Sequence, residues 1–286
     1  MTEQTLSADG VDLCFETFGD PADETVLLIA GGAQSMVWWE DEFCVLLAKA
    51  GRHVIRYDHR DTGRSSSSQP GQPSYTGRDL LTDPLRILDA VGVERAHLVG
   101  LSMGGGIAQR IAIEYPLRVH TLSLASTSPV VAAGQAGELP PPSQQVMATF
   151  TDPEPEPDWN DRDAVVAYRV DLERPYAGSL GFDESRYRQL AVREVNRTRD
   201  MASSISNHFV LADDTPADAR LEQITAPTLV LHGTTDPMFP IEHGQALAAG
   251  IAGARFVPLP GAGHQQPPPE LWDLAIGAIV EHTGVR

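Results

Sequence analysis

The hydrophobic positions of the chain follow two alternating patterns over its first 127 residues. Short apolar runs typical of buried strands alternate with stretches whose apolar residues recur at helical spacing. We predict strands at 11–19, 24–32, 52–58, 95–101 and 120–126, and helices at 39–51, 77–92 and 107–116. Pro84 is expected to kink the second of these helices or to delay its start. This alternation predicts βαβ units and a mainly parallel α/β sheet.

The same alternation resumes after residue 225, where we predict strands at 226–233 and 254–261 and helices at 241–253 and 270–284. The middle of the chain differs, because 128–224 holds no convincing buried strand. Linkers rich in proline and acidic residues, at 137–147 and 151–159, precede segments with helical spacing at 162–174, 183–200 and 201–212. We therefore predict a core made of 1–127 and 225–286, with 128–224 as a mostly helical cap. A cap over the carboxyl edge of the sheet would cover the place where open parallel sheets bind ligands. The alternative is a separate domain with no part in the site.

Composition narrows the classes of function. The formal net charge of −18 argues against nucleic-acid binding, which needs a basic surface. No apolar run approaches the length of a membrane span, and the polar, acidic start of the chain does not resemble a signal peptide. The two cysteines, Cys14 and Cys44, form neither a disulfide framework nor a metal cluster, so a reduced cytoplasm is the expected location. No phosphate-binding motif is complete, and no cofactor or metal is expected.

A serine stands between glycines directly after the apolar run at 95–101. Gly100-Leu101-Ser102-Met103-Gly104 matches the G-x-S-x-G nucleophile elbow, a sharp strand-to-helix turn that exposes the serine hydroxyl. Three consecutive glycines, beginning at Gly104, would each cost a helix about 1 kcal/mol. That cost suggests that side chains at these positions would clash with the strand. The alternative is a glycine-rich turn whose serine only caps the helix.

Two further residues follow predicted strands at positions suited to acyl transfer. A serine hydroxyl needs a base, and the base needs an orienting acid. Asp236 comes just after the strand at 226–233, and His264 lies in a Gly/Pro-rich loop after the strand at 254–261. Because parallel strands end at one edge, both side chains can converge on Ser102. In the alternative interpretations, Asp236 caps the following helix and His264 is simply solvated.

The oxyanion of such a reaction needs backbone donors. The N–H of Met103, next to the serine, is one candidate, and Gly32 in the loop after the strand at 24–32 is the other. A simple tight turn is the alternative explanation of Gly32. An apolar pocket is also expected. Its candidate lining residues are Trp38, Trp39, Met238 and Phe239. Three aromatic residues of the cap could also approach the pocket: Tyr168, Tyr187 and Phe209. The more common role of such residues is to pack in the core of the cap.

These segments together resemble the α/β-hydrolase superfamily over nearly the whole chain. The stretch "IAGGAQSMVWWE" stands where these enzymes have a His-Gly oxyanion loop, here with Ala30 in place of the histidine. The stretch "YDHRDTGRSS" resembles their D-x-R-G-x-G-x-S turn, here with Asp61 in place of the first glycine. The core is similar to the aclacinomycin methylesterases, which cleave a carboxymethyl ester from an anthracycline polyketide. The resemblance implies the α/β-hydrolase fold, the triad Ser102, Asp236 and His264, and oxyanion donors at Gly32 and Met103.

We therefore expect a cofactor-independent serine hydrolase that acts on a small-molecule carboxylic ester. The candidate activity is that of a methylesterase for a hydrophobic, polyketide-like substrate of antibiotic biosynthesis. Carbon–carbon bond hydrolases and cofactor-free haloperoxidases share the triad and stay open, as does aminopeptidase activity. Dehalogenases and epoxide hydrolases of this fold use an aspartate nucleophile, so Ser102 disfavours both. An alternative of another class is a non-catalytic receptor that keeps the triad. The sequence does not predict the oligomeric state.

Overall fold

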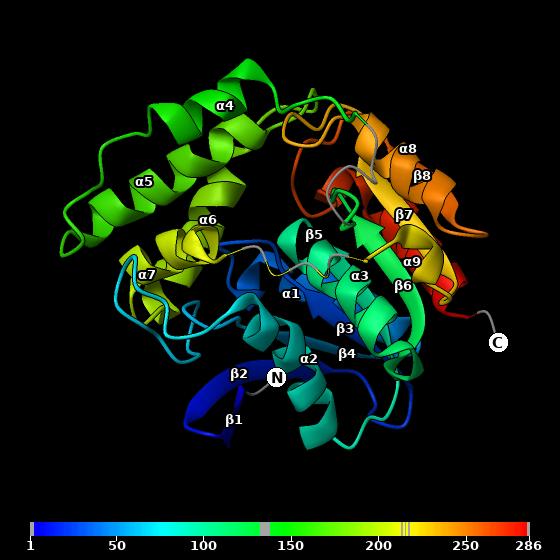
Figure 1. The fold of residues 1–286 in the computed structure, drawn as a ribbon. Coiled ribbons are helices and arrows are strands. Elements are labelled where there is room, and N and C mark those ends of the chain that lie inside the picture. The colour runs from blue at the N-terminus through cyan, green and yellow to red at the C-terminus, as the bar shows by residue number, and fades with distance from the viewer. Residues whose placement is uncertain (1–2, 132–137, 213, 215, 217, 285–286) are drawn as a thin grey trace.

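The computed structural model describes residues 3–131, 138–212, 214, 216 and 218–284. The strands found there form one sheet in the order β1-β2-β4-β3-β5-β6-β7-β8 (Figure 1). Their bounds are β1 (Gln4–Ala8), β2 (Val11–Phe18), β3 (Glu24–Ile29), β4 (Arg52–Tyr57), β5 (Ala96–Leu101), β6 (Val119–Ala125), β7 (Thr228–Gly233) and β8 (Arg255–Leu259). β2 is antiparallel to β1 and β4, and the pairs from β4 through β8 are parallel. The predicted mainly parallel α/β architecture is confirmed.

Helices cover both faces of the sheet, because side chains alternate between the faces along each strand. In β3, Val26 and Leu28 pack with α1 (Asp41–Lys49) and α9 (Trp272–Thr283), whereas Leu27 and Ile29 pack on the other face. That second face is covered by α2 (Gly77–Ala90), α3 (Met103–Glu114) and α8 (Ile241–Gly250). All four β3 side chains are fully buried, so the strand lies in the centre of a three-layer core.

Between β6 and β7 the described residues form helices and no strand. We call the described part of 128–224 the insertion. Its helices, grouped at the upper left of Figure 1, are α4 (Gln144–Thr151), α5 (Arg162–Glu173), α6 (Glu184–Arg197) and α7 (Met201–Ser206). Short 3₁₀ helices across the chain are η1 (Met36–Trp38), η2 (Pro116–Arg118), η3 (Arg174–Tyr176), η4 (Asn207–Val210), η5 (Leu221–Gln223) and η6 (Pro269–Leu271).

Three local features differ from the sequence-based expectations. The edge strand β1 was not predicted, because it is short and polar, although Asp9 and Gly10 both have the positive φ of a two-residue hairpin turn. α4 lies in a segment expected to be a linker, where the Ser143 hydroxyl accepts the Val146 N–H as an N-cap. α2 begins at Gly77, so Pro84 does not delay its start and instead lies buried within the helix.

The glycines after Ser102 allow α3 to lie directly against the sheet. α3 begins four residues earlier than the predicted 107, so the glycines form its first turn. A Cβ on Gly104 would lie 2.4 Å from the carbonyl oxygen of Ile29 and 2.5 Å from that of Ala30. A Cβ on Gly105 would lie 2.7 Å from the Thr127 side chain. These approaches leave no room for a side chain and explain why the helix keeps residues of poor helix propensity.

We expect Gly104→Ala to lower the free energy of unfolding by about 2 kcal/mol or more, because two backbone oxygens would have to move. Gly277→Ala is the matched control, since Gly277 is an exposed helical glycine of α9 whose Cβ would meet nothing within 4 Å. That variant should be stabilised by about 0.5–1 kcal/mol. Urea denaturation of both variants measures the difference. Equal effects of the two substitutions would contradict the close-approach explanation.

Candidate active site

The structure brings Ser102, His264 and Asp236 into one hydrogen-bonded row. Ser102 lies between β5 and α3, Asp236 follows β7, and His264 follows β8. The Ser102 Oγ is 2.9 Å from His264 Nε2, and His264 Nδ1 is 2.9 Å from Asp236 Oδ2. Because β5, β7 and β8 run in the same direction, their carboxyl ends meet at one edge of the sheet. Three residues that are far apart in the sequence thus lie together at this edge.

Ser102 has an unusual backbone conformation, with φ 51° and ψ −117°. A non-glycine residue rarely adopts such angles unless neighbouring groups hold it there. The Ser102 N–H donates to the carbonyl of Ala125 at 3.1 Å, and its carbonyl accepts from the Thr127 hydroxyl at 2.8 Å and from the Gly106 N–H at 3.0 Å. These bonds fix the turn and present the hydroxyl to His264.

Asp236 is buried, and its two oxygens have separate partners. Oδ1 accepts the backbone N–H groups of Met238 and Phe239, each at 2.9 Å, which leaves Oδ2 for His264. Burial alone would raise the pKa of Asp236, but the His264 ring and these amides lower it below its usual value. The carboxylate is therefore held ionised. The interpretation of Asp236 as a helix N-cap does not apply to α8, whose N-cap residue is Pro240.

The loop that carries His264 packs against the insertion. The His264 N–H donates to the carbonyl of Tyr176 in η3 at 2.9 Å, and the two rings lie 5.9 Å apart. Phe239 meets the His264 ring edge-on, with centroids 5.2 Å apart. A Cβ on Gly263 would lie 2.2 Å from the Tyr176 carbonyl oxygen, so this contact requires glycine. Tyr176 was not among the predicted site residues, because no local pattern indicates a contact across so many residues.

Gly32 and Met103, the predicted oxyanion donors, lie close together. A Cβ on Gly32 would be 3.7 Å from Met103 Sδ and 3.2 Å from Cε1 of Phe209. Neither backbone N–H is engaged with another residue in the part of the chain that the structure describes. Two free amides beside a hydroxyl can bind a developing negative charge. The oxyanion role stays a prediction.

The predicted pocket residues fall into two environments. Trp39 is 1% exposed and packs against Phe43 in the core between the sheet and α1. Trp38 is also buried, and it contacts Tyr187 of α6 and lies beneath the guanidinium of Arg169. Packing thus accounts for both tryptophans, and their contribution to a pocket stays a prediction.

The remaining candidates differ in exposure. Met238 and Phe239 are half-buried beside Asp236, and Phe209 is 65% exposed next to Gly32. Tyr187 is buried in the core of the insertion, and half-buried Tyr168 meets Trp159 edge-on. Of the aromatic residues expected from the cap, Phe209 is therefore the one that reaches the candidate oxyanion glycine.

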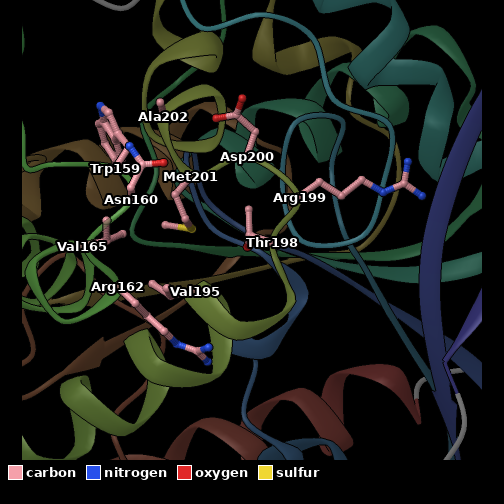
Figure 2. A pocket seen from close by; sticks show the side chains of 10 residues that line it. All are labelled: Trp159, Asn160, Arg162, Val165, Val195, Thr198, Arg199, Asp200, Met201 and Ala202. Carbon is pink, nitrogen blue, oxygen red and sulfur yellow. The ribbon is translucent and has the colours of Figure 1, made fainter.

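Two cavities lie away from the row of three side chains. One, of about 370 Å³, is lined by α5, α6 and α7 residues that include Val165, Val195 and Met201 (Figure 2). The other, of about 530 Å³, lies where β3, β4 and β5 begin and includes Arg52 and His97. Among the described residues, none of the helices has the length and apolarity to cross a membrane, and no group of His, Cys, Asp or Glu is arranged to hold a metal ion.

The chain resembles a protein family, two curated relatives and a solved structure. Residues 24–266 match the sequence model of the α/β-hydrolase fold family. The chain is 35% identical over 296 residues to rhodomycin D methylesterase DauP of Streptomyces sp. (strain C5), covering 99% of this chain and 98% of that protein. It is 34% identical, over the same shares, to rhodomycin D methylesterase DnrP of Streptomyces peucetius. A solved hydrolase from Pseudomonas aeruginosa PA01 is 29% identical with a TM-score of 0.72, covering 99% of this chain and 98% of that one.

The strained backbone of Ser102 predicts an unusual response to glycine. Ser102→Gly and Ser102→Ala both remove the hydroxyl, but only glycine adopts a positive φ without strain. We expect the glycine variant to be more stable than the alanine variant by about 1 kcal/mol, after the entropy that glycine costs. Thermal or urea unfolding of the pair measures this difference. A glycine variant that is clearly the less stable one would show that the turn is not strained.

Proposed function

The chain belongs to the α/β-hydrolase fold family, and we propose that it is a carboxylic ester hydrolase with Ser102, His264 and Asp236 as its catalytic unit. The observation that carries this proposal is the continuous row from Asp236 through His264 to Ser102, with 2.9 Å at each step. Its order matches the acid, base and nucleophile of serine hydrolases. The full-length likeness to two methylesterases supports an ester as the substrate.

In the first half of the reaction, the Ser102 Oγ attacks the ester carbonyl carbon while His264 Nε2 takes the hydroxyl proton. Asp236 accepts the His264 Nδ1–H and stabilises the imidazolium that forms. The carbonyl oxygen becomes an oxyanion and is bound by the N–H groups of Gly32 and Met103. The C–O bond to the alcohol then breaks, and His264 returns its proton to the leaving oxygen. An acyl group remains on Ser102.

Water completes the cycle. His264 Nε2 takes a proton from a water molecule, and the resulting oxygen nucleophile attacks the acyl carbon. The same two amides stabilise the second tetrahedral intermediate. Collapse of this intermediate returns the proton to Ser102 and releases the carboxylic acid. The residues named here need no cofactor for these steps.

We further propose that the substrate is the methyl ester of a hydrophobic, polyketide-like acid. Both methylesterase relatives are named for rhodomycin D, and their likeness extends over nearly all of this chain. Half-buried Phe239 and Met238 beside Asp236 and exposed Phe209 beside Gly32 offer apolar surface on two sides of Ser102. Flat aromatic substrates bury most of their surface against such side chains.

The insertion is proposed to act as a cap, with 1–127 and 225–286 as the core and 128–224 as the capping unit. The support is its contact with both halves of the site. Tyr176 holds the His264 loop, and Phe209 lies against Gly32. A separate domain without a role in the site would not make both contacts.

Replacing Ser102 with alanine should lower ester turnover by at least about 10³-fold, because the members of a triad act as one unit. The test is a panel of methyl esters, aryl esters, lactones and ring-fission diketones, with the wild-type chain and the variant run side by side.

The same panel separates the alternative functions. Preference for a diketone would favour carbon–carbon bond hydrolysis. Halide peroxidation or amide turnover without ester turnover would favour the other enzymatic alternatives. Fluorophosphonate labelling of Ser102 with no turnover of any ester would indicate a receptor.

Phe239→Ala should change substrate preference rather than chemistry. We expect kcat/KM for a bulky aromatic methyl ester to fall about fivefold to tenfold relative to that for methyl acetate, because an aromatic contact is lost. Leu274→Ala, a truncation of a partly exposed α9 side chain, is the control and should leave the ratio unchanged. If Phe239→Ala gives the wild-type ratio, this side chain does not contact the bulky part of the substrate.

A further inference from the structure

The loop that presents Gly32 is held by side chains of the insertion. We propose that His208 of η4 is a positioning residue for the oxyanion site, because it fixes the backbone of Ala33, directly after Gly32. The inference rests on the proposed function, since it concerns how the Gly32 N–H is aimed. It assigns to the insertion a part in building the site as well as covering it.

Two hydrogen bonds define the ring of His208. The Ala33 N–H donates to His208 Nδ1 at 3.1 Å, and His208 Nε2 lies 2.9 Å from the carbonyl oxygen of Arg60. A backbone N–H can only donate, so Nδ1 has no proton, and Nε2–H donates to Arg60. Burial lowers the pKa of His208, which favours this neutral form. The ring also packs edge-on against His59 and Tyr75, so its orientation is fixed.

The backbone of Ala33 explains why this bond is needed. Ala33 has a φ of 57°, in the left-handed region that residues other than glycine adopt only when neighbouring groups hold them there. The N–H that His208 binds belongs to the peptide group joining Gly32 to Ala33. The Gly32 N–H belongs to the preceding peptide group, and the two peptide groups share the Gly32 Cα. Holding the Gly32–Ala33 peptide group therefore fixes the position of this Cα and, with it, one end of the peptide group that carries the Gly32 N–H.

Buried charges of α5 and α6 hold the rest of the loop. Arg169 Nη2 donates to the Ala33 carbonyl oxygen at 3.4 Å, and Glu194 Oε1 accepts the Ser35 N–H at 2.9 Å. Arg169 Nε also donates to Glu194 Oε2 at 2.8 Å, and neither side chain is more than 2% exposed. Both polar groups of Ala33 are thus bound by the insertion.

The residue after His208 contacts the same loop. A Cβ on Gly32 would lie 3.2 Å from Cε1 of Phe209, so the Phe209 ring closes over this glycine from the insertion side. His208 and Phe209 therefore contact consecutive residues of the loop, Ala33 and Gly32. η4 therefore forms part of the oxyanion site. A lid that only covered the substrate would not bind this loop.

Two substitutions separate the two bonds of His208. In His208→Asn, the amide oxygen lies close to the position of Nδ1 and can still accept the Ala33 N–H, while the bond to Arg60 is lost. In His208→Gln, the amide nitrogen can reach the Arg60 carbonyl, while the acceptor for Ala33 is lost. Each variant thus loses one of the two hydrogen bonds. Only His208→Asn keeps the bond to Ala33, which holds the oxyanion loop.

We expect His208→Gln to lower kcat for a small ester at least about tenfold while KM stays within about threefold, because oxyanion binding acts on the transition state. The inhibition constant of a trifluoromethyl ketone, which forms a tetrahedral oxyanion on Ser102, should rise in parallel. His208→Asn should stay within about threefold of the wild-type values. Rates are expressed per site titrated with a fluorophosphonate, so that partial misfolding is not counted as a kinetic effect.

Ser203→Ala is the control, because it removes another bond between the insertion and the core, from Ser203 Oγ to the Ser68 carbonyl at 2.7 Å, without touching the Gly32 loop. It should leave kcat unchanged. His208→Leu is the second variant, to be used if His208→Gln does not fold. It removes both hydrogen bonds but keeps an apolar side chain, and it should show the same loss of kcat.

Equal effects of His208→Gln and His208→Asn, or a change in KM alone, would overturn the proposal. Failure of both His208→Gln and His208→Leu to fold would overturn it as well, since His208 would then serve stability. A wild-type chain that neither hydrolyses esters nor binds the ketone would instead contradict the proposed function, which keeps the two failures distinguishable.

Discussion

The geometry of the site depends on how closely the start of α3 packs against the sheet. Gly104 lies so near the end of β3 that a single Cβ would collide with two carbonyl oxygens. This approach sets the sharp turn in which Ser102 keeps a positive φ, and the Ala125 and Thr127 hydrogen bonds hold it there. With the hydroxyl raised above the sheet edge, a histidine after β8 can reach it. The glycines have poor helix propensity, but they allow the close packing that fixes the position of Ser102.

The insertion contributes to both sides of that hydroxyl. On one side, the carbonyl of Tyr176 holds the His264 backbone. On the other side, His208, Arg169 and Glu194 bind the loop that carries Gly32. Arg169 and Glu194 pair with each other inside the insertion, and each also binds a backbone group of this loop. Separating the insertion from the loop would leave these buried polar groups without their partners, which is costly.

The sequence predicted the features that depend on local pattern. The alternation of strands and helices, the elbow glycines and the strand-end positions of Asp236 and His264 were all accessible from it, because short motifs and parallel topology determine them. Tyr176, His208 and Arg169 were not accessible, since their contacts join segments far apart in the chain that share no local signal. Trp39 was predicted to line the pocket, but it packs in the core. The sequence does not distinguish these two roles for an aromatic residue in a loop near the site. Asp61 stands where the D-x-R-G-x-G-x-S turn has its first glycine, and it has a φ of 67°, in the left-handed region that favours glycine.

If Ser102 is the nucleophile, it becomes covalently acylated during ester turnover, and mass spectrometry can detect this acyl group. An activated ester such as a p-nitrophenyl ester is mixed with the wild-type chain, quenched in acid within the first turnover, and digested for peptide mapping. We expect the peptide that contains Ser102 to gain the mass of the acyl group, and this adduct to decay at the rate of turnover. An adduct confined to another residue, or full turnover with no adduct on Ser102 at early times, would contradict the acyl-enzyme mechanism.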